Sequence, residues 1–192
     1  MRVIAGQAKG RRLYSVPGPG TRPITDRAKT ALFNILQDDL LDCHFLDLFA
    51  GTGQVGIEAL SRYAARAVFV ESGAAAVRTI RQNLQLTGLA DKGEIVRADV
   101  FGYLSGRSAQ AFDYIYVAPP QYRQLWEQTL HYLDTYPDWL APDGWIIVQI
   151  NPVEDKPLTL AHFERFDQRK YGSVLLCFYA RRELPESHAA QS

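Results

Sequence analysis

Short apolar stretches alternate with amphipathic ones from residue 44 onward. Strands are expected at residues 44–48, 67–70, 94–97, 112–117 and 144–150. Between them, apolar residues recur at helical spacing over residues 55–62, 74–86 and 125–133. Strands that alternate with helices are typical of a mostly parallel sheet with helices on both faces.

The two ends of the chain differ from this alternation. Residues 163–170 and 174–180 are separated by a turn at Tyr171-Gly172 and predict an antiparallel hairpin that closes a seven-stranded sheet. Near the N-terminus, residues 2–5 predict a short strand, and Thr25 is a good N-cap for a helix that follows. The fold class is therefore α/β and Rossmann-like, with a small N-terminal extension.

Composition narrows the class of protein. Of 192 residues, 47% are hydrophobic and 22% are charged, which suits one folded domain. The longest apolar runs, residues 145–148 and 174–180, are too short to span a bilayer, so we expect a cytoplasmic protein without a membrane partner. Cys43 and Cys177 are expected to be buried free thiols. The four histidines show no metal-ligand spacing, and we expect no metal.

The zero net charge conceals an asymmetry. Residues 1–30 carry seven Lys or Arg side chains and one acid, Asp26, which leaves 14 basic and 20 acidic residues in the remainder. A basic arm on an acidic body suits a surface that meets a polyanion. A solvated basic terminus explains the charge equally well, so charge alone leaves both interpretations open.

A glycine-rich segment, residues 47–56, lies between the first strand and its helix. Glycines there let backbone approach a ligand at the carboxyl edge of the sheet. Gly51, Gly53 and Gly56 also match the dinucleotide fingerprint, with Glu71 twenty residues after Gly51. A nicotinamide- or flavin-dependent oxidoreductase is therefore an alternative.

Acidic residues at the strand ends favour a different cofactor. Asp47 would face a pyrophosphate unfavourably but suits a cationic, amino-acid-bearing ligand such as S-adenosylmethionine. Glu71 is placed to accept from ribose hydroxyls, which either cofactor offers, and Asp99, expected at the end of the third strand, from an adenine amine. We therefore predict an S-adenosylmethionine site made of Asp47, Phe49, Ala50, Gly51, Thr52, Gly53, Glu71, Asp99 and Val100.

The chain resembles the RsmD-like family of bacterial ribosomal RNA guanine-N2 methyltransferases over nearly its whole length. The segments that carry the resemblance are residues 2–13, 22–27, 32–34, 47–53 and 56–62. It implies a class I methyltransferase fold, S-adenosylmethionine as methyl donor, and a guanine amine of small-subunit (16S) ribosomal RNA, or of the assembling 30S subunit, as acceptor. It also implies that the loop after the fourth strand receives the base, through Ala118, Pro119, Pro120, Gln121 and Tyr122.

This loop departs from the family pattern of Asp or Asn, two prolines, and Phe or Tyr. Ala118 replaces the polar residue, and Gln121 stands at the aromatic position, with Tyr122 one residue later. One catalytic polar contact contributes about 10²–10³ in rate. We hypothesise that activity is retained, with Gln121 and Tyr122 partly replacing the lost groups. A homologue that binds cofactor and RNA without transfer is the alternative.

The resemblance also gives the basic arm a role. The residues expected to contact RNA are Lys9, Arg11, Arg12, Arg22, Thr25 and Arg27. We predict an RNA-binding extension at residues 1–24, a methyltransferase domain at residues 25–182 and a disordered tail at residues 183–192. Nothing in the sequence suggests more than a monomer. Whether the target amine is guanine N2 or adenine N6 is left open.

Overall fold

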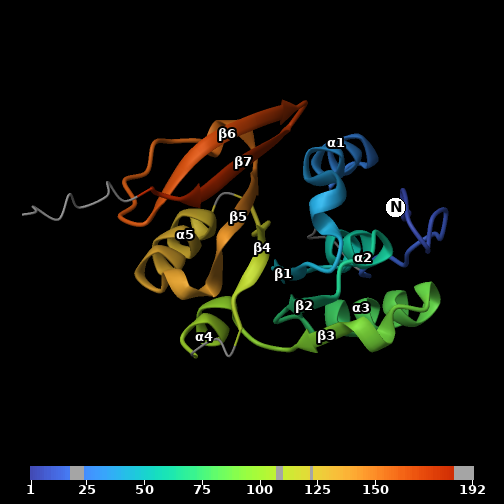
Figure 1. Ribbon diagram of the computed structural model, residues 1–192. Helices are drawn as coiled ribbons and strands as arrows, with labels where there is room; N and C mark the ends of the chain where they lie inside the picture. Colours follow the sequence, from blue (N-terminus) through green and yellow to red (C-terminus); the bar gives the residue numbers. More distant parts are fainter. Residues whose placement is uncertain (18–23, 107–109, 122, 184–192) are drawn as a thin grey trace, which may run out of the picture.

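A seven-stranded sheet forms the centre of the protein (Figure 1). The computed structural model describes residues 1–17, 24–106, 110–121 and 123–183. The strand order is β3-β2-β1-β4-β5-β7-β6. The first five strands in sequence are parallel, and their bounds are β1 His44–Leu48, β2 Arg66–Val70, β3 Gly93–Val96, β4 Phe112–Val117 and β5 Leu140–Ile150.

Helices cover both faces of the sheet, so most side chains of the central strands β1, β2 and β4 are buried. The helices α1 (Asp26–Leu36), α2 (Gln54–Ser61) and α3 (Ala74–Thr87) pack with one buried cluster. The helices α4 (Val100–Leu104) and α5 (Leu125–Thr135) pack with a second cluster on the opposite face. This arrangement confirms the predicted α/β layers (Figure 1).

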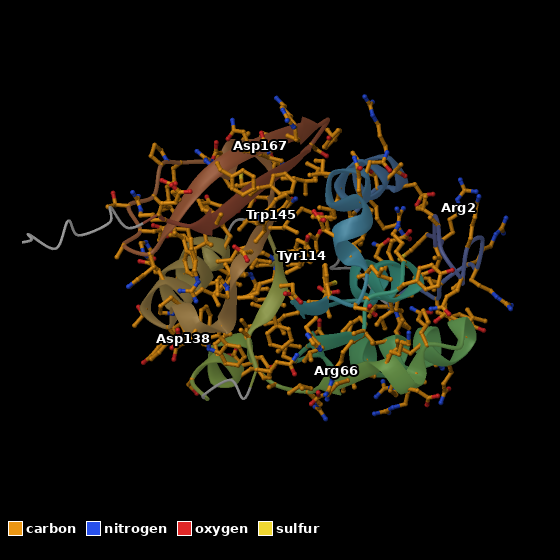
Figure 2. All side chains as sticks on the ribbon, viewed as in Figure 1. Arg2, Arg66, Tyr114, Asp138, Trp145 and Asp167 are labelled. Carbon is orange, nitrogen blue, oxygen red and sulfur yellow. The ribbon has the colours of Figure 1, made fainter. Side chains whose placement is uncertain are left out.

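The predicted C-terminal hairpin is confirmed. Strands β6 (Phe163–Tyr171) and β7 (Val174–Arg181) pair antiparallel, and β7 also pairs antiparallel with β5. An aromatic row extends across the sheet toward this hairpin, since the rings of Tyr114 and Trp145 lie 6.1 Å apart between centroids (Figure 2). The ring centroid of Trp145 in turn lies 5.0 Å from that of Phe166 in β6. Aromatic packing therefore continues from the parallel core into the hairpin.

Several local predictions were incomplete or wrong. The strand expected at residues 2–5 is only an isolated bridge between Arg2 and Arg12. The third strand ends at Val96, and Asp99 is the N-cap of α4, a helix that the sequence pattern did not predict. Four short 3-10 helices were also not predicted, at Gln37–Leu40, Ala90–Lys92, Pro137–Trp139 and Pro152–Glu154.

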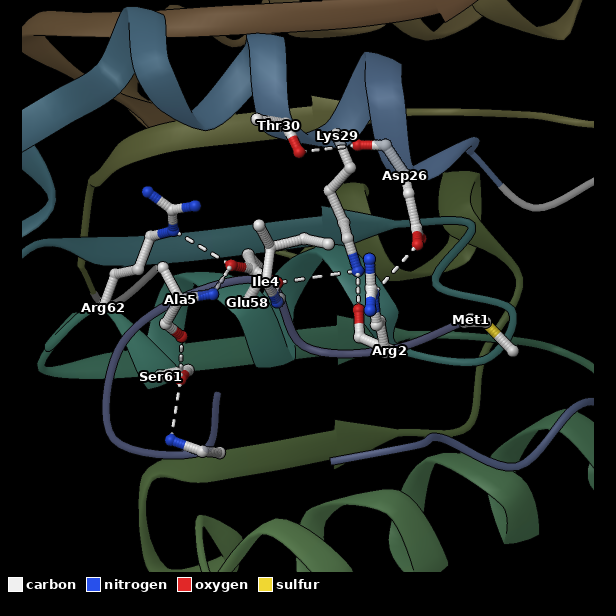
Figure 3. A network of polar contacts seen from close by, with 12 residues as sticks. Met1, Arg2, Ile4, Ala5, Asp26, Lys29, Thr30, Glu58, Ser61 and Arg62 are labelled. Carbon is white, nitrogen blue, oxygen red and sulfur yellow. Dashed lines mark hydrogen bonds and ion pairs between the residues drawn. The ribbon is translucent and has the colours of Figure 1, made fainter. Parts of the chain in front are cut away.

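The N-terminal segment, residues 1–16, packs into the body of the protein. Val3, Ala8 and Leu13 belong to the same buried cluster as α1, α2 and α3. The backbone N–H groups of Ile4 and Ala5 donate to the Glu58 carboxylate on α2, over 2.8 and 3.0 Å (Figure 3). The basic side chains of this segment are therefore presented on a backbone held by the core. The domain boundary near residue 24 stays a prediction.

The two cysteines are as expected. Cys43 and Cys177 are free and buried. Burial raises the pKa of the Cys43 thiol to about 12, with Asp113 adding to the shift. Among the described residues, no helix has both the length and the apolar character needed to cross a membrane.

Candidate functional site

A cavity of about 280 Å³ opens at the carboxyl ends of β1, β2, β4 and β5. This is the edge at which open α/β sheets bind ligands. The cavity brings together the glycine-rich segment and the loop after β4. Its lining residues are Ile24, Asp47, Phe49, Ala50, Gly51, Thr52, Gln54, Val55, Glu71, Ser72, Tyr116, Ala118, Pro119, Pro120, Gln121 and Gln149.

The glycine-rich segment owes its path to left-handed backbone. Gly51 has φ +57° and Gly53 has φ +75°, and Phe49 also has positive φ, at +61°. The Gly53 N–H donates to the Ala50 carbonyl over 2.7 Å, which closes the turn directly before α2. At Gly56, a Cβ would lie 2.4 Å from the Phe69 ring, so this glycine allows helix and strand to pack closely. That role suits either cofactor class.

Asp47 lies in β1 beneath this turn and is almost completely buried. The Gly56 N–H donates to its Oδ2 over 3.1 Å. Burial raises the pKa of Asp47 well above its ordinary range, the Gly56 hydrogen bond opposes this, and the Glu71 carboxylate adds to it. A cationic ligand group beside this carboxyl would oppose the shift and favour its ionised form.

Glu71 follows β2 and faces the same turn. Its Oε2 accepts from the Gly51 N–H over 2.9 Å, and its Oε1 accepts from the Gly73 N–H over 2.7 Å. These bonds hold the carboxylate at the cavity wall. Each oxygen has a second lone-pair site, so the group remains able to accept from ligand hydroxyls.

The loop after β4 forms the opposite wall through Ala118, Pro119, Pro120 and Gln121. Tyr122, the residue expected to stack on a base, lies outside the described residues. The structure therefore brings four of the five expected acceptor-loop residues to the cofactor cavity.

Other expected cofactor residues do not line the cavity. Gly53 is the N-cap of α2, and Val100 is buried in α4. Asp99 caps α4, because its Oδ1 accepts from the N–H groups of Phe101 and Gly102 over 2.9 and 3.1 Å. Their roles toward a cofactor stay predictions.

The sequence reasoning missed several lining residues, namely Ile24, Gln54, Val55, Ser72, Tyr116 and Gln149. Tyr116 was detectable, because it lies two positions before Ala118 and strand side chains alternate between faces. Its hydroxyl donates to Oε1 of Gln149, and burial raises its pKa well above the ordinary range, with Asp47 adding to the shift.

The expected RNA residues lie mostly on the surface. Lys9, Arg11, Arg12 and Arg27 are exposed, and Arg22 lies outside the described residues. Thr25 accepts from the Ala28 N–H over 3.2 Å, as predicted for an N-cap. The neighbouring Ile24 lines the cavity, so the start of α1 lies at the cavity wall. In the part of the chain that the structure describes, no three His, Cys, Asp or Glu side chains gather as a metal site.

The chain matches the family described as "Conserved hypothetical protein 95" over residues 1–180. It belongs to this family. "Ribosomal RNA small subunit methyltransferase D" of Escherichia coli strain K12 is 34% identical over 189 residues, which cover 98% of this chain and 94% of that protein. YlbH of Bacillus subtilis strain 168 is 33% identical, covering 95% of this chain and all of that protein. The expected RsmD-like resemblance is thus confirmed.

Solved structures agree with this assignment. The Escherichia coli protein yhhF superposes with a TM-score of 0.83 at 34% identity, covering 94% of this chain and 97% of that chain. An RNA methyltransferase from Salinibacter ruber, solved in complex with S-adenosyl-L-homocysteine, superposes with a TM-score of 0.63 at 16% identity, covering 86% and 98%. The latter likeness concerns the fold alone. The fold is that of class I methyltransferases, which disfavours the oxidoreductase alternative.

Proposed function

We propose that this protein transfers a methyl group from S-adenosylmethionine to the exocyclic N2 amine of a guanine in small-subunit ribosomal RNA. One observation carries the proposal: the glycine-rich segment and the loop Ala118–Gln121 line the same cavity. A methyl donor on the first and an amine on the second would be in contact, and alignment of reacting atoms is a large part of catalysis. The methyltransferase relatives support the reaction class.

The cavity residues fit S-adenosylmethionine. The Glu71 carboxylate suits two ribose hydroxyls, and buried Asp47 suits a ligand that carries positive charge. When bound, the cofactor supplies an electrophilic methyl group on a sulfonium. A dinucleotide would place an anionic pyrophosphate beside the buried Asp47, whereas the methyl donor is cationic. The site therefore favours S-adenosylmethionine over NAD.

The acceptor loop orients the amine. In the proposed reaction the guanine N2 forms a bond to the methyl carbon, the sulfonium keeps the electrons of the broken bond and becomes a thioether, and the amine loses a proton to solvent. The backbone carbonyls of Ala118 and Pro119 accept from the amine hydrogens, which directs the nitrogen lone pair at the methyl. The Gln121 amide oxygen adds an acceptor, and Tyr122 stacks on a base extruded from its helix.

The basic side chains of the N-terminal segment hold the RNA. Lys9, Arg11 and Arg12 are exposed on a backbone that the core holds in place. They contact phosphates, which fixes position without reading sequence. Because the core already holds this backbone, these side chains would contact the RNA without a folding cost.

The deciding experiment measures transfer of a labelled methyl group from S-adenosylmethionine to small ribosomal subunits whose RNA lacks this methyl group. Label in a guanine N2 is the expected result, and label in an adenine N6 would correct the acceptor. Subunits that already carry the methyl group are the control and should take up no label. Cofactor binding without any transfer would contradict the proposed reaction.

A second candidate rests on one specific feature, the alanine at position 118. Without a side-chain acceptor there, the second candidate is a homologue that binds cofactor and RNA without catalysing transfer. The same labelling experiment separates the two functions.

A further inference from the structure

Gln54 is the first residue of α2 and lines the cofactor cavity. The residue is 5% exposed, and its Oε1 is buried without a hydrogen-bond partner in the described protein. Buried polar atoms in native proteins are nearly always paired, so such an atom beside a cavity indicates a partner that arrives with a ligand.

The backbone beside Gln54 has the same character. The N-cap Gly53 has no side chain with which to cap the first turn of α2. The third N–H of the helix, that of Gly56, is engaged by Asp47, and the N–H groups of Gln54 and Val55 precede it. An uncapped helix N-terminus is suited to a carboxylate. A carboxamide and two backbone amides therefore lie together at the cavity wall.

The sheet order indicates which end of the cofactor lies there. Glu71 follows β2, whereas Tyr116 lies in β4, on the other side of β1. A ribose held by Glu71, with the adenine on the β3 side as predicted for Asp99, leaves the other end of the cofactor to extend past the turn toward Gln54 and Asp47. That end is an α-amino acid, which carries an ammonium and a carboxylate.

We propose that the Gln54 carboxamide binds the zwitterionic amino-acid end of the methyl donor. Its oxygen accepts from the ammonium, and the first-turn amides of α2 receive the carboxylate. Rotation about the Cγ–Cδ bond, a broad and soft torsion, turns the oxygen toward the cavity. This inference rests on the proposed function, because it concerns the same cofactor.

The test compares two ligands by calorimetry. S-adenosylhomocysteine carries the amino-acid end, whereas 5′-methylthioadenosine keeps the nucleoside and thioether and lacks that end. In Gln54→Met, which conserves length, S-adenosylhomocysteine should bind about 10- to 100-fold more weakly, as expected for loss of a hydrogen bond to a charged group. Binding of 5′-methylthioadenosine should change less than about twofold.

Stability gives an independent measurement. Gln54→Met removes an unpaired polar atom from the interior, so the melting temperature without ligand should stay the same or rise. Gln54→Glu is the second variant. It keeps an acceptor for the ammonium but repels the carboxylate, so it should weaken binding of S-adenosylhomocysteine more than binding of 5′-methylthioadenosine.

Equal weakening of both ligands, or no weakening of either, would overturn the inference. So would a fall in melting temperature of the ligand-free Gln54→Met protein, because it would show a structural role. Failure of the unaltered protein to bind S-adenosylhomocysteine would instead contradict the proposed cofactor, and the inference about Gln54 with it. Binding by the unaltered protein with no effect at Gln54 leaves the proposed function standing.

Discussion

Nζ of Lys29 on α1 lies 3.5 Å from Oε2 of Glu58 on α2, and both side chains are completely buried. Lys29 also donates to the Arg2 carbonyl over 2.5 Å, and Glu58 accepts from Arg62 as well as from two backbone N–H groups of the N-terminal segment (Figure 3). Burial lowers the pKa of Lys29, and Glu58 opposes the shift. The ion pair thus joins both helices to the arm that carries Arg11 and Arg12.

Lys29→Met should destabilise the protein by about 3–5 kcal/mol, because it removes one partner of a completely buried ion pair. Urea unfolding at neutral pH measures the free energy. Arg66→Gln is the matched control, since it breaks an exposed pair with Glu94 and should cost less than about 1 kcal/mol. Equal losses in the two variants would show that the buried pair adds little.

Asp47→Asn should stabilise the ligand-free protein and weaken binding of S-adenosylmethionine. Burial raises the folded-state pKa of Asp47, so the folded state binds more protons than the unfolded state above the ordinary pKa of about 4. Wild-type stability therefore falls as pH rises from that value toward the folded-state pKa. Asparagine keeps an acceptor for the Gly56 N–H and removes this dependence.

The pH dependence is checked by measuring the free energy of unfolding of both proteins at several pH values between about 4 and 8. The lower limit is the ordinary carboxyl pKa, above which the effect of Asp47 should begin. The difference between variant and wild type should grow with pH. A constant difference would show that Asp47 is ionised in the folded protein over this whole pH range. Unchanged cofactor affinity would show that Asp47 does not bind the cofactor.

Elements with a strong pattern were predictable from the sequence, and short or singular features were not. Strand β1 was predicted to the residue, because its apolar side chains are buried on both faces. Helix α4 has only five residues, too few for a helical period to show. Asp99 was misplaced for a related reason, because a polar residue after a strand can end it or cap the next helix.

The site was partly predictable on the same grounds. Asp47, Gly51 and Glu71 line the cavity as expected, since their spacing follows the ends of two strands. Gln54 could not be found, because a polar residue in the first turn of a helix is usually solvated and its burial depends on neighbours distant in sequence. Gln149 reaches the cavity from β5 only because β4 and β5 are adjacent.

Replacing Arg11 and Arg12 together by Gln should weaken RNA binding and flatten its salt dependence. Each lost phosphate contact lowers the slope of log affinity against log salt by about 0.7–0.9. Binding to a fragment of small-subunit RNA across a range of salt concentrations measures this slope. An unchanged slope would show that the arm is not the RNA surface.

The matched control for the arm is the double change Arg66→Gln and Lys92→Gln, which removes the same charge. Arg66 begins β2 and Lys92 directly precedes β3, so both lie at the edge of the sheet opposite the cavity. This variant should keep the wild-type slope. A similar fall in both variants would show that net charge, rather than the arm, controls binding.

Ala118→Asp restores the side-chain acceptor that the related methyltransferases carry, and the gain in turnover should be less than about tenfold if Gln121 and the loop carbonyls already orient the amine. The basis is that one catalytic polar contact is worth about 10²–10³ when nothing replaces it. Initial rates of methyl transfer to unmethylated small subunits measure the effect, with Ala118→Asn as an uncharged companion. A gain of 10² or more would show that the loop is not adapted.

Tyr122→Ala in the same assay should abolish turnover if the Tyr122 ring stacks on the base. An unchanged rate would exclude that role.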